Sequence, residues 1–598
     1  MNNDRPEQTV AAKADADEIA NSGLLPQMRM MISALWAAPV RNTLFWLSGS
    51  LFIVIAVTAY GQIRLNSWNQ PFYDALSHRN FKVFLEQLGV FGLIAGALLV
   101  LNVAQRWLGE TLKLKLRQGL GHDLIQNWLV PGRAFRLTNA GVIGINPDQR
   151  MHEDARHLAE TSADLGIGLL QSSILLITFV KVLWSLSNNF VFHVDGRQFA
   201  IPGYMVWAAI LYSGSASLLS YWVGRSLVDR NADRYAREAD MRFSLVRVNE
   251  HIDSVTLSGG ESDEARRIDL DFAAVLAAMR RLVTGVTNLT WVTASYGWFT
   301  LVAPILVAAP LYFAGNITFG GLMLASGAFM QVQSSLRWFV DNFSTIADWR
   351  ATLLRVAGFR RAVISMDDLH DVESRIVFKT GNDDNFCIDN LEISSSSGCT
   401  MLQEQNVRLA GGERVLIIGD SGSGKTLLFR ALAGIWPWGA GTITRPSEAE
   451  ILYMPRTPYL PPGTLREVLA YPKGTDTYAT DAYSAALARV KLDRLEPLID
   501  TARRWDRELS DDEQQGLAFA RLVLHKPHWV LIDEVLDGLD DAGMKIVIDV
   551  FKTDLAAMGV INIGRAGSNQ LFPRVLHLVK DCNTRKLLPA APLLALSK

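Results

Sequence analysis

Six long apolar segments before residue 340 constrain most strongly what this chain can fold into. Each is close to the ~20 residues that a helix needs to cross ~30 Å of hydrocarbon. A buried helix of a soluble protein is the alternative for any one segment, but it does not explain six in series with charged connections between them. The sequence therefore predicts an α-helical membrane domain with six spans. The predicted spans are residues 45–63, 90–108, 165–186, 204–223, 289–313 and 320–339.

The rest of the chain, from about residue 360 onward, has the composition of a soluble domain. Over all 598 residues, 58 Lys and Arg nearly balance 60 Asp and Glu, and a formal charge of −2 gives no basic field for nucleic acid. Cys387, Cys399 and Cys582 all lie in this second part and lack the spacing of metal ligands. We therefore predict reduced thiols and no nucleic-acid partner.

The placement of charge predicts how the chain sits in the membrane. The first 22 residues are polar and lack the pattern of a signal peptide, so we expect a cytoplasmic tail. The apolar segment 28–36 fits either an interfacial helix or a plain linker. Lys and Arg are abundant after the second and fourth spans, whereas the third is followed by Arg197 alone and the fifth by none. Because basic residues concentrate on the cytoplasmic side, both termini are predicted to be cytoplasmic.

A glycine-rich motif follows the short apolar run at 415–418 and precedes a helix-forming segment at 427–433. It has the pattern G-x4-G-K-[ST] of a P-loop, in which backbone N–H groups surround phosphate oxygens at a helix N-terminus. Its residues are Gly419, Asp420, Ser421, Gly422, Ser423, Gly424, Lys425 and Thr426. We expect Lys425 to reach the β- and γ-phosphates and the Thr426 hydroxyl to bind Mg²⁺. The motif in this setting predicts an ATP or GTP site.

A second motif, at 529–534, is an apolar strand that ends in two carboxylates. We expect Asp533 to hold Mg²⁺ through water and Glu534 to polarise the attacking water as general base. An acidic strand end is common, and it is the alternative. The position of the motif after the P-loop, and the following Asp537-Gly-Leu-Asp540, favour the catalytic interpretation.

The order of these motifs resembles that of an ABC ATPase. Between them lie Tyr-Met-Pro-Arg-Thr-Pro-Tyr-Leu at 453–460 and Leu-Ser-Asp-Asp-Glu-Gln-Gln at 509–515. The match is to YddA-like half-transporters, whose membrane domain is similar to those of the SbmA/BacA peptide transporters and the ABCD transporters. Two motifs of the membrane half support this resemblance: Trp-Asn-Gln-Pro-Phe-Tyr-Asp-Ala-Leu at 68–76, and Asn-Pro-Asp-Gln-Arg at 146–150 with Asp154.

The resemblance implies a six-span, exporter-like (type IV) membrane domain fused to an α/β P-loop ATPase domain with an ABC helical subdomain. It implies ATP and Mg²⁺ as cofactors and a bacterial inner-membrane location. The resemblance also implies a second half-transporter as partner, in a homodimer or a heterodimer, and a peptide, a cobalamin-like or an acyl compound as the solute. The expected divisions are a tail and interfacial helix at 1–40, the membrane domain at 41–360, a linker at 361–380 and the nucleotide-binding domain at 381–598.

Three motifs depart from the family pattern: the signature, the Q-loop and the switch region. In the signature, Ser510 is present, but Asp512 replaces a glycine that approaches the γ-phosphate held by the other subunit, and Asp511 adds a carboxylate. Arg456 stands at the Q-loop glutamine and Arg565 at the switch histidine. A carboxylate ~4 Å from a phosphate oxygen opposes it by about 4 kcal/mol at an effective dielectric constant of ~20. A second signature-like stretch, at 257–261, lies too far upstream and is interpreted as a chance glycine turn.

Two interpretations of these departures stay open. Either hydrolysis is slowed or lost, which would make the chain a nucleotide-binding subunit or an ATP-gated module, or Arg456 and Arg565 compensate for the added carboxylates. The aromatic residue that stacks on adenine is also undetermined, with Phe386 as a candidate. Polar side chains in or near the spans are candidate cavity residues, because polarity inside a membrane is costly. They are Lys181, Gln331, Gln333 and Arg337, and snorkelling to the interface is the alternative for Lys181.

Overall fold

The computed structural model describes residues 24–138, 147–188, 191–194, 197–365, 375–381, 383–395, 398–446, 451–565 and 571–581. The chain divides into two compact units. The helical unit comprises residues 16–127 and 146–360, and the sheet unit comprises 1–15, 128–145 and 361–598. Residues 1–23, which include the predicted tail at 1–22, lie outside the described residues, as do Asn146, Cys582 and residues 366–374 of the predicted linker.

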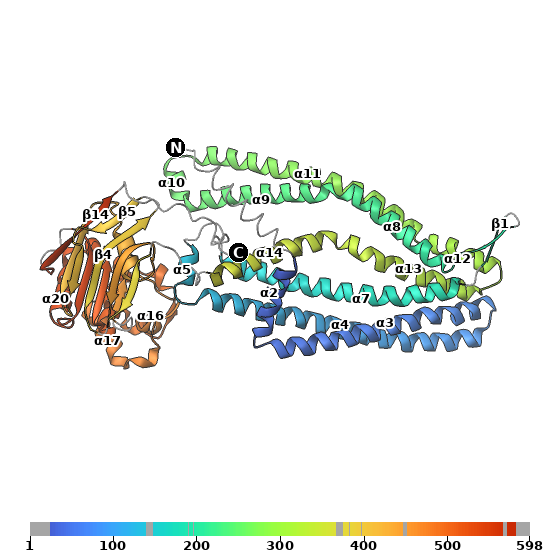
Figure 1. Cartoon of the computed structure of the whole chain (residues 1–598), viewed down its shortest axis with the longest axis horizontal. Coiled ribbons are helices and arrows are strands. Elements are labelled where there is room, and N and C mark those ends of the chain that lie inside the picture. Colours follow the sequence, from blue (N-terminus) through green and yellow to red (C-terminus); the bar gives the residue numbers. More distant parts are fainter. Residues whose placement is uncertain are drawn as a thin grey trace. The chain divides into compact units, whose positions relative to one another are not determined.

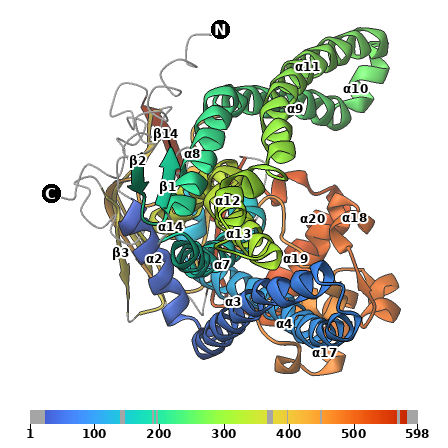
Figure 2. The ribbon, with the colours of Figure 1, turned by 90° about the vertical axis from the view of Figure 1, so that its right-hand side faces the viewer.

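The helical unit consists of long helices joined by short turns (Figure 1). Its first helices are α2 (Leu24–Ala37), α3 (Arg41–Ser77), α4 (Phe81–Trp128), α6 (Pro147–Gln149), the π-helix η2 (Arg150–Asp154) and α7 (Ala155–Ser187). After a hairpin of β1 (Val191–Val194) and β2 (Arg197–Ala200) come α8 (Tyr204–Gly224), α9 (Ser226–Glu250), α10 (Ile252–Leu257), α11 (Glu261–Phe299), α12 (Ala303–Phe313), α13 (Phe319–Asp341) and α14 (Phe343–Ser365). Helices α9 and α11 pack along each other, with α10 at their turn (Figure 2).

Five helical stretches among the described residues are long and apolar enough to cross a membrane, whereas the sequence predicted six spans. The five are Arg41–Ser77, Phe81–Trp128, Pro147–Ser187, Tyr204–Glu250 and Glu261–Phe313, and they contain the first five predicted spans. The sixth, 320–339, lies in α13, which is less apolar. Helix α13 packs against α3, α7, α8 and α12, and its Gln333 and Ser335 are buried. It therefore faces protein, where polar side chains are tolerated better than against lipid.

The motif at 68–76 fixes the start of α13 to the end of α3. The carboxylate of Asp74 accepts a hydrogen bond from the Gly320 N–H (2.8 Å) and another from the Thr318 hydroxyl (2.9 Å). A Cβ at Gly320 would lie 2.0 Å from the Gln70 carbonyl oxygen, so the close approach requires glycine. The motif thus caps a helix that begins 244 residues further along the chain.

A ten-stranded sheet organises the second unit, in the order β3-β8-β4-β5-β14-β7-β13-β12-β9, with β6 paired to β4. The strands are β3 (Val377–Thr380), β4 (Phe386–Ser395), β5 (Gly398–Leu402), β6 (Asn406–Leu409), β7 (Arg414–Gly419), β8 (Gly439–Arg445), β9 (Ile451–Met454), β12 (Trp529–Asp533), β13 (Gly559–Gly564) and β14 (Arg574–Asp581). Strands β7, β13, β12 and β9 are mutually parallel, so their carboxyl ends meet at one edge. Strand β12 is buried throughout, as expected of a central parallel strand.

Helices complete the sheet unit. Helix α15 (Lys425–Leu432) follows β7, and α20 (Asp541–Lys552) follows β12. A separate apolar cluster, which includes the fully buried Trp505 and Tyr483, joins the small helices of a helical subdomain. These helices are α16 (Leu465–Ala470), α17 (Thr480–Arg489), α18 (Trp505–Glu508) and α19 (Asp511–His525). Helix α5 (Arg133–Thr138) also belongs to this unit, and its Phe135 lies beneath the Arg430 guanidinium.

Candidate active site

The P-loop connects the end of β7 to the start of α15. Gly422 (φ +80°) and Gly424 (φ +94°) adopt left-handed backbone conformations that glycine accepts without strain. A Cβ at Gly424 would lie 2.5 Å from the Thr400 hydroxyl oxygen, and that hydroxyl donates to the Ser423 carbonyl (3.0 Å). Thr400 therefore stabilises the P-loop through this hydrogen bond. The local sequence pattern gives no indication of this role. Asp420 and Ser421 are exposed on the loop, whereas the Ser423 side chain is buried.

Asp533 ends strand β12 beside the P-loop. Its side chain is buried, and Thr426 at the start of α15 donates a hydrogen bond to its carboxylate. Burial raises the pKa of Asp533, the adjacent Glu534 charge raises it further, and the Thr426 hydrogen bond lowers it. The other carboxylate oxygen has no hydrogen-bond partner among the described residues. A buried carboxylate with a free oxygen beside a hydroxyl is a donor set that suits Mg²⁺.

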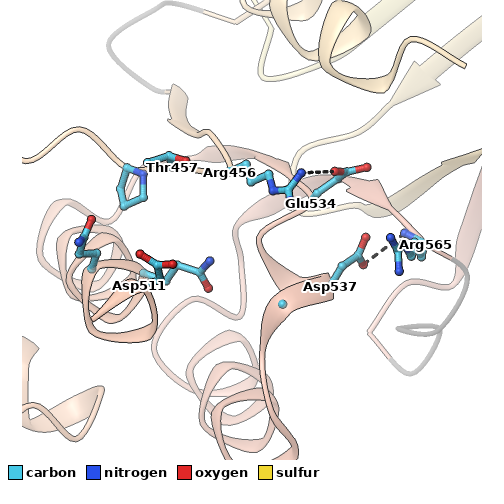
Figure 3. A pocket seen from close by; sticks show the side chains of 10 residues that line it. Arg456, Thr457, Asp511, Glu534, Asp537 and Arg565 are labelled. Atoms are coloured by element: carbon cyan, nitrogen blue, oxygen red, sulfur yellow. Dashed lines mark hydrogen bonds and ion pairs between the residues drawn. The ribbon is translucent and has the colours of Figure 1, made fainter. Parts of the chain in front are cut away.

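Glu534 contacts two cations. Its backbone has the strained φ of +55°, and its N–H is held by the Ile563 carbonyl (2.8 Å). The carboxylate lies 2.9 Å from the Lys425 ammonium. It also lies 3.7 Å from the Arg456 guanidinium (Figure 3). Lys425 is only 10% exposed and Arg456 is 77% exposed. The β12 turn thus directs Glu534 toward the P-loop lysine.

A polar cavity of about 300 Å³ lies beside Glu534 (Figure 3). Arg456 from the loop after β9 and Arg565 from the end of β13 both line it, together with Asp511 of α19. Asp537 also lines the cavity and accepts a hydrogen bond from the Arg565 N–H (3.2 Å). The two arginines that replace the family's glutamine and histidine therefore share one cavity with the candidate base.

The signature residues lie at the N-terminus of α19. Ser510 caps the helix: its hydroxyl accepts from the Glu513 N–H, and the Glu513 carboxylate accepts from the Ser510 N–H. Asp511 and Asp512 occupy the first turn, where the helix dipole favours carboxylates. Within the described part of the chain, Ser510 and Asp512 are not among the residues that line the cavity.

Neither Phe386 nor the signature-like stretch at 257–261 is among the described residues that line the cavity beside Glu534. Phe386 was a candidate for stacking on adenine, but it is fully buried and packs against Trp529 with ring centres 5.9 Å apart. That candidate is wrong, because β4 directs its side chain into the core. The signature-like stretch at 257–261 forms the turn between α10 and α11 in the helical unit, with Gly259 at φ +59°. Its interpretation as a glycine turn is confirmed.

Comparison with known families and proteins gives matches in both halves of the chain. Residues 32–313 match the family model "ABC transporter transmembrane region 2", and residues 402–537 match the model "ABC transporter". The Escherichia coli inner membrane ABC transporter ATP-binding protein YddA is 28% identical over 87% of this chain and 93% of its own length. The chloroplastic ABC transporter D family member 2 of Arabidopsis thaliana is 26% identical over 86% and 80%.

Solved structures give the same architecture. A bacterial Atm1-family ABC exporter with ATP bound superposes with a TM-score of 0.69 and 17% identity, covering 91% of this chain and 94% of that one. The fold implies a membrane environment, a bound nucleotide and pairing with a second half-molecule. The chain thus belongs to the ABC transporters, as a half-molecule that joins a membrane domain to an ATP-binding domain and couples ATP hydrolysis to transport.

Proposed function

We propose that the P-loop and the ends of β12, β9 and β13 form one ATP and Mg²⁺ site with assigned roles. Lys425 contacts the β- and γ-phosphates, and the P-loop backbone surrounds their oxygens. Thr426 and Asp533 would hold Mg²⁺, which when bound neutralises phosphate charge. Their fit rests on the buried Asp533 carboxylate, which has one oxygen on Thr426 and one free among the described residues.

Glu534 acts as the general base, and this assignment rests on its contact with Lys425. The phosphates of ATP would compete for the Lys425 ammonium, which lies 2.9 Å from the Glu534 carboxylate. Bound ATP therefore releases Glu534 to accept a proton from water. Arg456 and Arg565 are proposed to face the γ-phosphate from the shared cavity, in place of the family's glutamine and histidine.

A second half-transporter completes the site in this proposal, because Ser510 and Asp512 would face the nucleotide of the partner. Large apolar side chains are exposed on the paired helices α9 and α11 outside the predicted spans. Phe243, Leu270 and Phe272 are 68%, 68% and 46% exposed. A partner that covers them would remove apolar area from water. Both a homodimer and a heterodimer with a different ABC half-molecule satisfy this argument.

The remaining assignments follow from the resemblance of the membrane half. We propose a multi-pass protein of the bacterial inner membrane with both termini in the cytoplasm. The proposed solute is peptide-like, cobalamin-like or amphipathic. Gln333 is buried in α13, and its amide nitrogen has no partner among the described residues. In this proposal it contacts the solute when α13 separates from its neighbouring helices. We also propose that residues 41–360 form the membrane domain and residues 381–598 the nucleotide-binding domain.

The test of the site is ATP hydrolysis by the purified protein in lipid vesicles. Glu534→Gln should keep ATP binding and lower turnover by about 10²–10⁴-fold, the usual contribution of a general base. Glu508→Gln is the matched control, because Glu508 lies in the same unit and pairs with Arg503 at the surface (2.8 Å). Equal turnover by wild type and Glu534→Gln, with ATP bound by both, would refute the role of Glu534.

A further inference from the structure

An apolar cavity of about 800 Å³ lies in the helical unit between α2, α3, α4 and α7. Leu35 of α2, Leu112 and Leu116 of α4, and Ile167 and Leu170 of α7 form much of its wall. Its volume falls within the range of about 300 to 1,000 Å³ that is typical of sites for a whole small ligand. The cavity is separate from the ATP site, because all of its walls belong to the helical unit.

Two glycines shape this cavity. Gly119 lets α4 approach the turn between α2 and α3, since a Cβ there would lie 3.0 Å from Val40 and 3.2 Å from Leu35. Gly166 of α7 lines the cavity and has nothing within 4 Å of the position of a Cβ. The packing at Gly119 is therefore tight beside Leu35 of the wall, while the wall at Gly166 has room for a guest.

A single charged side chain borders the apolar wall. Arg41, the first residue of α3, is exposed and is the one charged residue among the described residues that line the cavity. Its guanidinium has no hydrogen bond or ion pair to any of the described side chains. The neighbouring Ser162 hydroxyl already accepts a hydrogen bond from the Trp349 indole (2.8 Å). An apolar cavity with one unpaired cation at its edge is complementary to an amphiphile with one negative charge.

The position of the cavity along α3 matches the edge of a bilayer. Arg41 begins a helix that is long and apolar enough to cross a membrane. Helix α2 lies across the long helices rather than along them (Figures 1 and 2). Trp36 and Trp46 are 64% and 72% exposed, and tryptophan concentrates where hydrocarbon meets headgroups. These features place Arg41 at headgroup level and the apolar wall beside the acyl chains.

We propose that this cavity is a binding site for an anionic phospholipid. One acyl chain lies in the cavity, and the headgroup phosphate contacts the Arg41 guanidinium. The two parts of the lipid make separate contributions. The cavity supplies affinity for any acyl chain, because the methylene groups that it buries are removed from water. Arg41 supplies the preference for negative charge, which for one basic residue at a membrane surface amounts to about fivefold.

The test measures lipid retained by the purified full-length protein. Protein reconstituted in equal parts of phosphatidylcholine and phosphatidylglycerol is washed in detergent, and the lipids that remain are counted by native mass spectrometry. Wild type should retain phosphatidylglycerol about fivefold over phosphatidylcholine. Arg41→Ala should lose the preference but still retain lipid, whereas Gly166→Trp, which puts an indole into part of the cavity, should lower the retention of both lipids. Arg29→Ala, which removes an exposed cation of α2 that does not line the cavity, is the control.

Each outcome decides the proposal. Retention of both lipids in the proportion supplied, or an equal effect of Arg41→Ala and Arg29→Ala, would overturn the anionic site. Retention of lipid by Gly166→Trp at the wild-type level would overturn the proposal that the acyl chain occupies the cavity. A thermal unfolding transition like that of wild type shows that the helical unit of each variant has folded. Because lipid retention needs no ATP hydrolysis, failure here is distinguishable from failure of the proposed ATP site.

Discussion

Asp154 offers the sharpest test of how the membrane motifs hold the helical unit together. Its buried carboxylate accepts hydrogen bonds from the Arg150 guanidinium at 2.7 Å and from the Arg355 guanidinium at 3.1 and 3.0 Å. Arg355 lies on α14, so Asp154 joins the π-helix η2 to the last helix before the sheet unit. A second bidentate pair, Arg360 to Asp123 of α4 (2.7 and 3.1 Å), secures α14 one turn later.

The expected loss of stability in Asp154→Asn follows from the burial of the Asp154 carboxylate. Breaking a buried ion pair costs about 3–5 kcal/mol because an uncompensated charge is left behind. Arg150 and Arg355 keep 31% and 39% of their side-chain surface, so water can take over part of the lost bonding. Asp154→Asn should therefore lower stability by about 2–3 kcal/mol, and the melting temperature by about 3–4 °C for a unit of this size.

Thermal unfolding of the protein in lipid nanodiscs is the assay, with Asp154→Asn, Arg355→Gln and the double variant forming a cycle. The two residues should show a coupling energy of about 1–2 kcal/mol. Glu153→Gln is the control, because it removes the neighbouring charge from a surface pair with Arg156 that is worth about 0–1 kcal/mol. A coupling energy below about 0.5 kcal/mol would show that the Asp154 pairing does not tie η2 to α14.

Two variants of the ATP site give further tests. Arg456→Gln should raise the KM for ATP by up to about fivefold, because one exposed cation near a phosphate contributes about 1 kcal/mol. A higher kcat would show instead that Arg456 restrains Glu534. Asp533→Asn should abolish Mg²⁺-dependent hydrolysis yet raise the melting temperature of the nucleotide-free protein, because burial raises the pKa of Asp533 and its ionised form destabilises the fold. That gain should hold at neutral pH and vanish as the pH falls below about 4, and a gain that persists there would exclude this cause.

The sequence predicted the fold well where a local pattern determines the structure. Five of the six spans were visible because their helices need an apolar surface over about 20 residues. The P-loop was visible because its glycines and Lys425 are adjacent in the chain. Helix α13 was assigned as a span on the same grounds, although packing among four other helices makes it less apolar than a lipid-facing helix. Hydropathy cannot distinguish contact with lipid from contact with other helices.

Contacts between distant residues could not be predicted. Asp74 caps a helix that starts more than 240 residues later, and Thr400 supports the P-loop from a neighbouring strand. Nothing in the local pattern marks either role. Phe386 looked available for adenine because aromatic residues before the P-loop are suitable stacking partners, but the alternation of β4 points it inward. Sheet register decides such orientations, and a shift of one residue would have reversed this one.

The acidic residues at the signature position have opposite effects on the stability of helix α19 and on its attraction for phosphate. Asp511, Asp512 and Glu513 fill the first turn of α19, where each carboxylate stabilises the helix by about 0.3–1 kcal/mol. The same carboxylates cancel the positive potential with which a helix N-terminus attracts phosphate. Asp511 lines one cavity with the guanidinium groups of Arg456 and Arg565. The residues that depart from the family pattern thus include two new cations beside a new carboxylate. Within this cavity the changes redistribute charge, which favours a site that still attracts ATP phosphates over one that has lost that attraction.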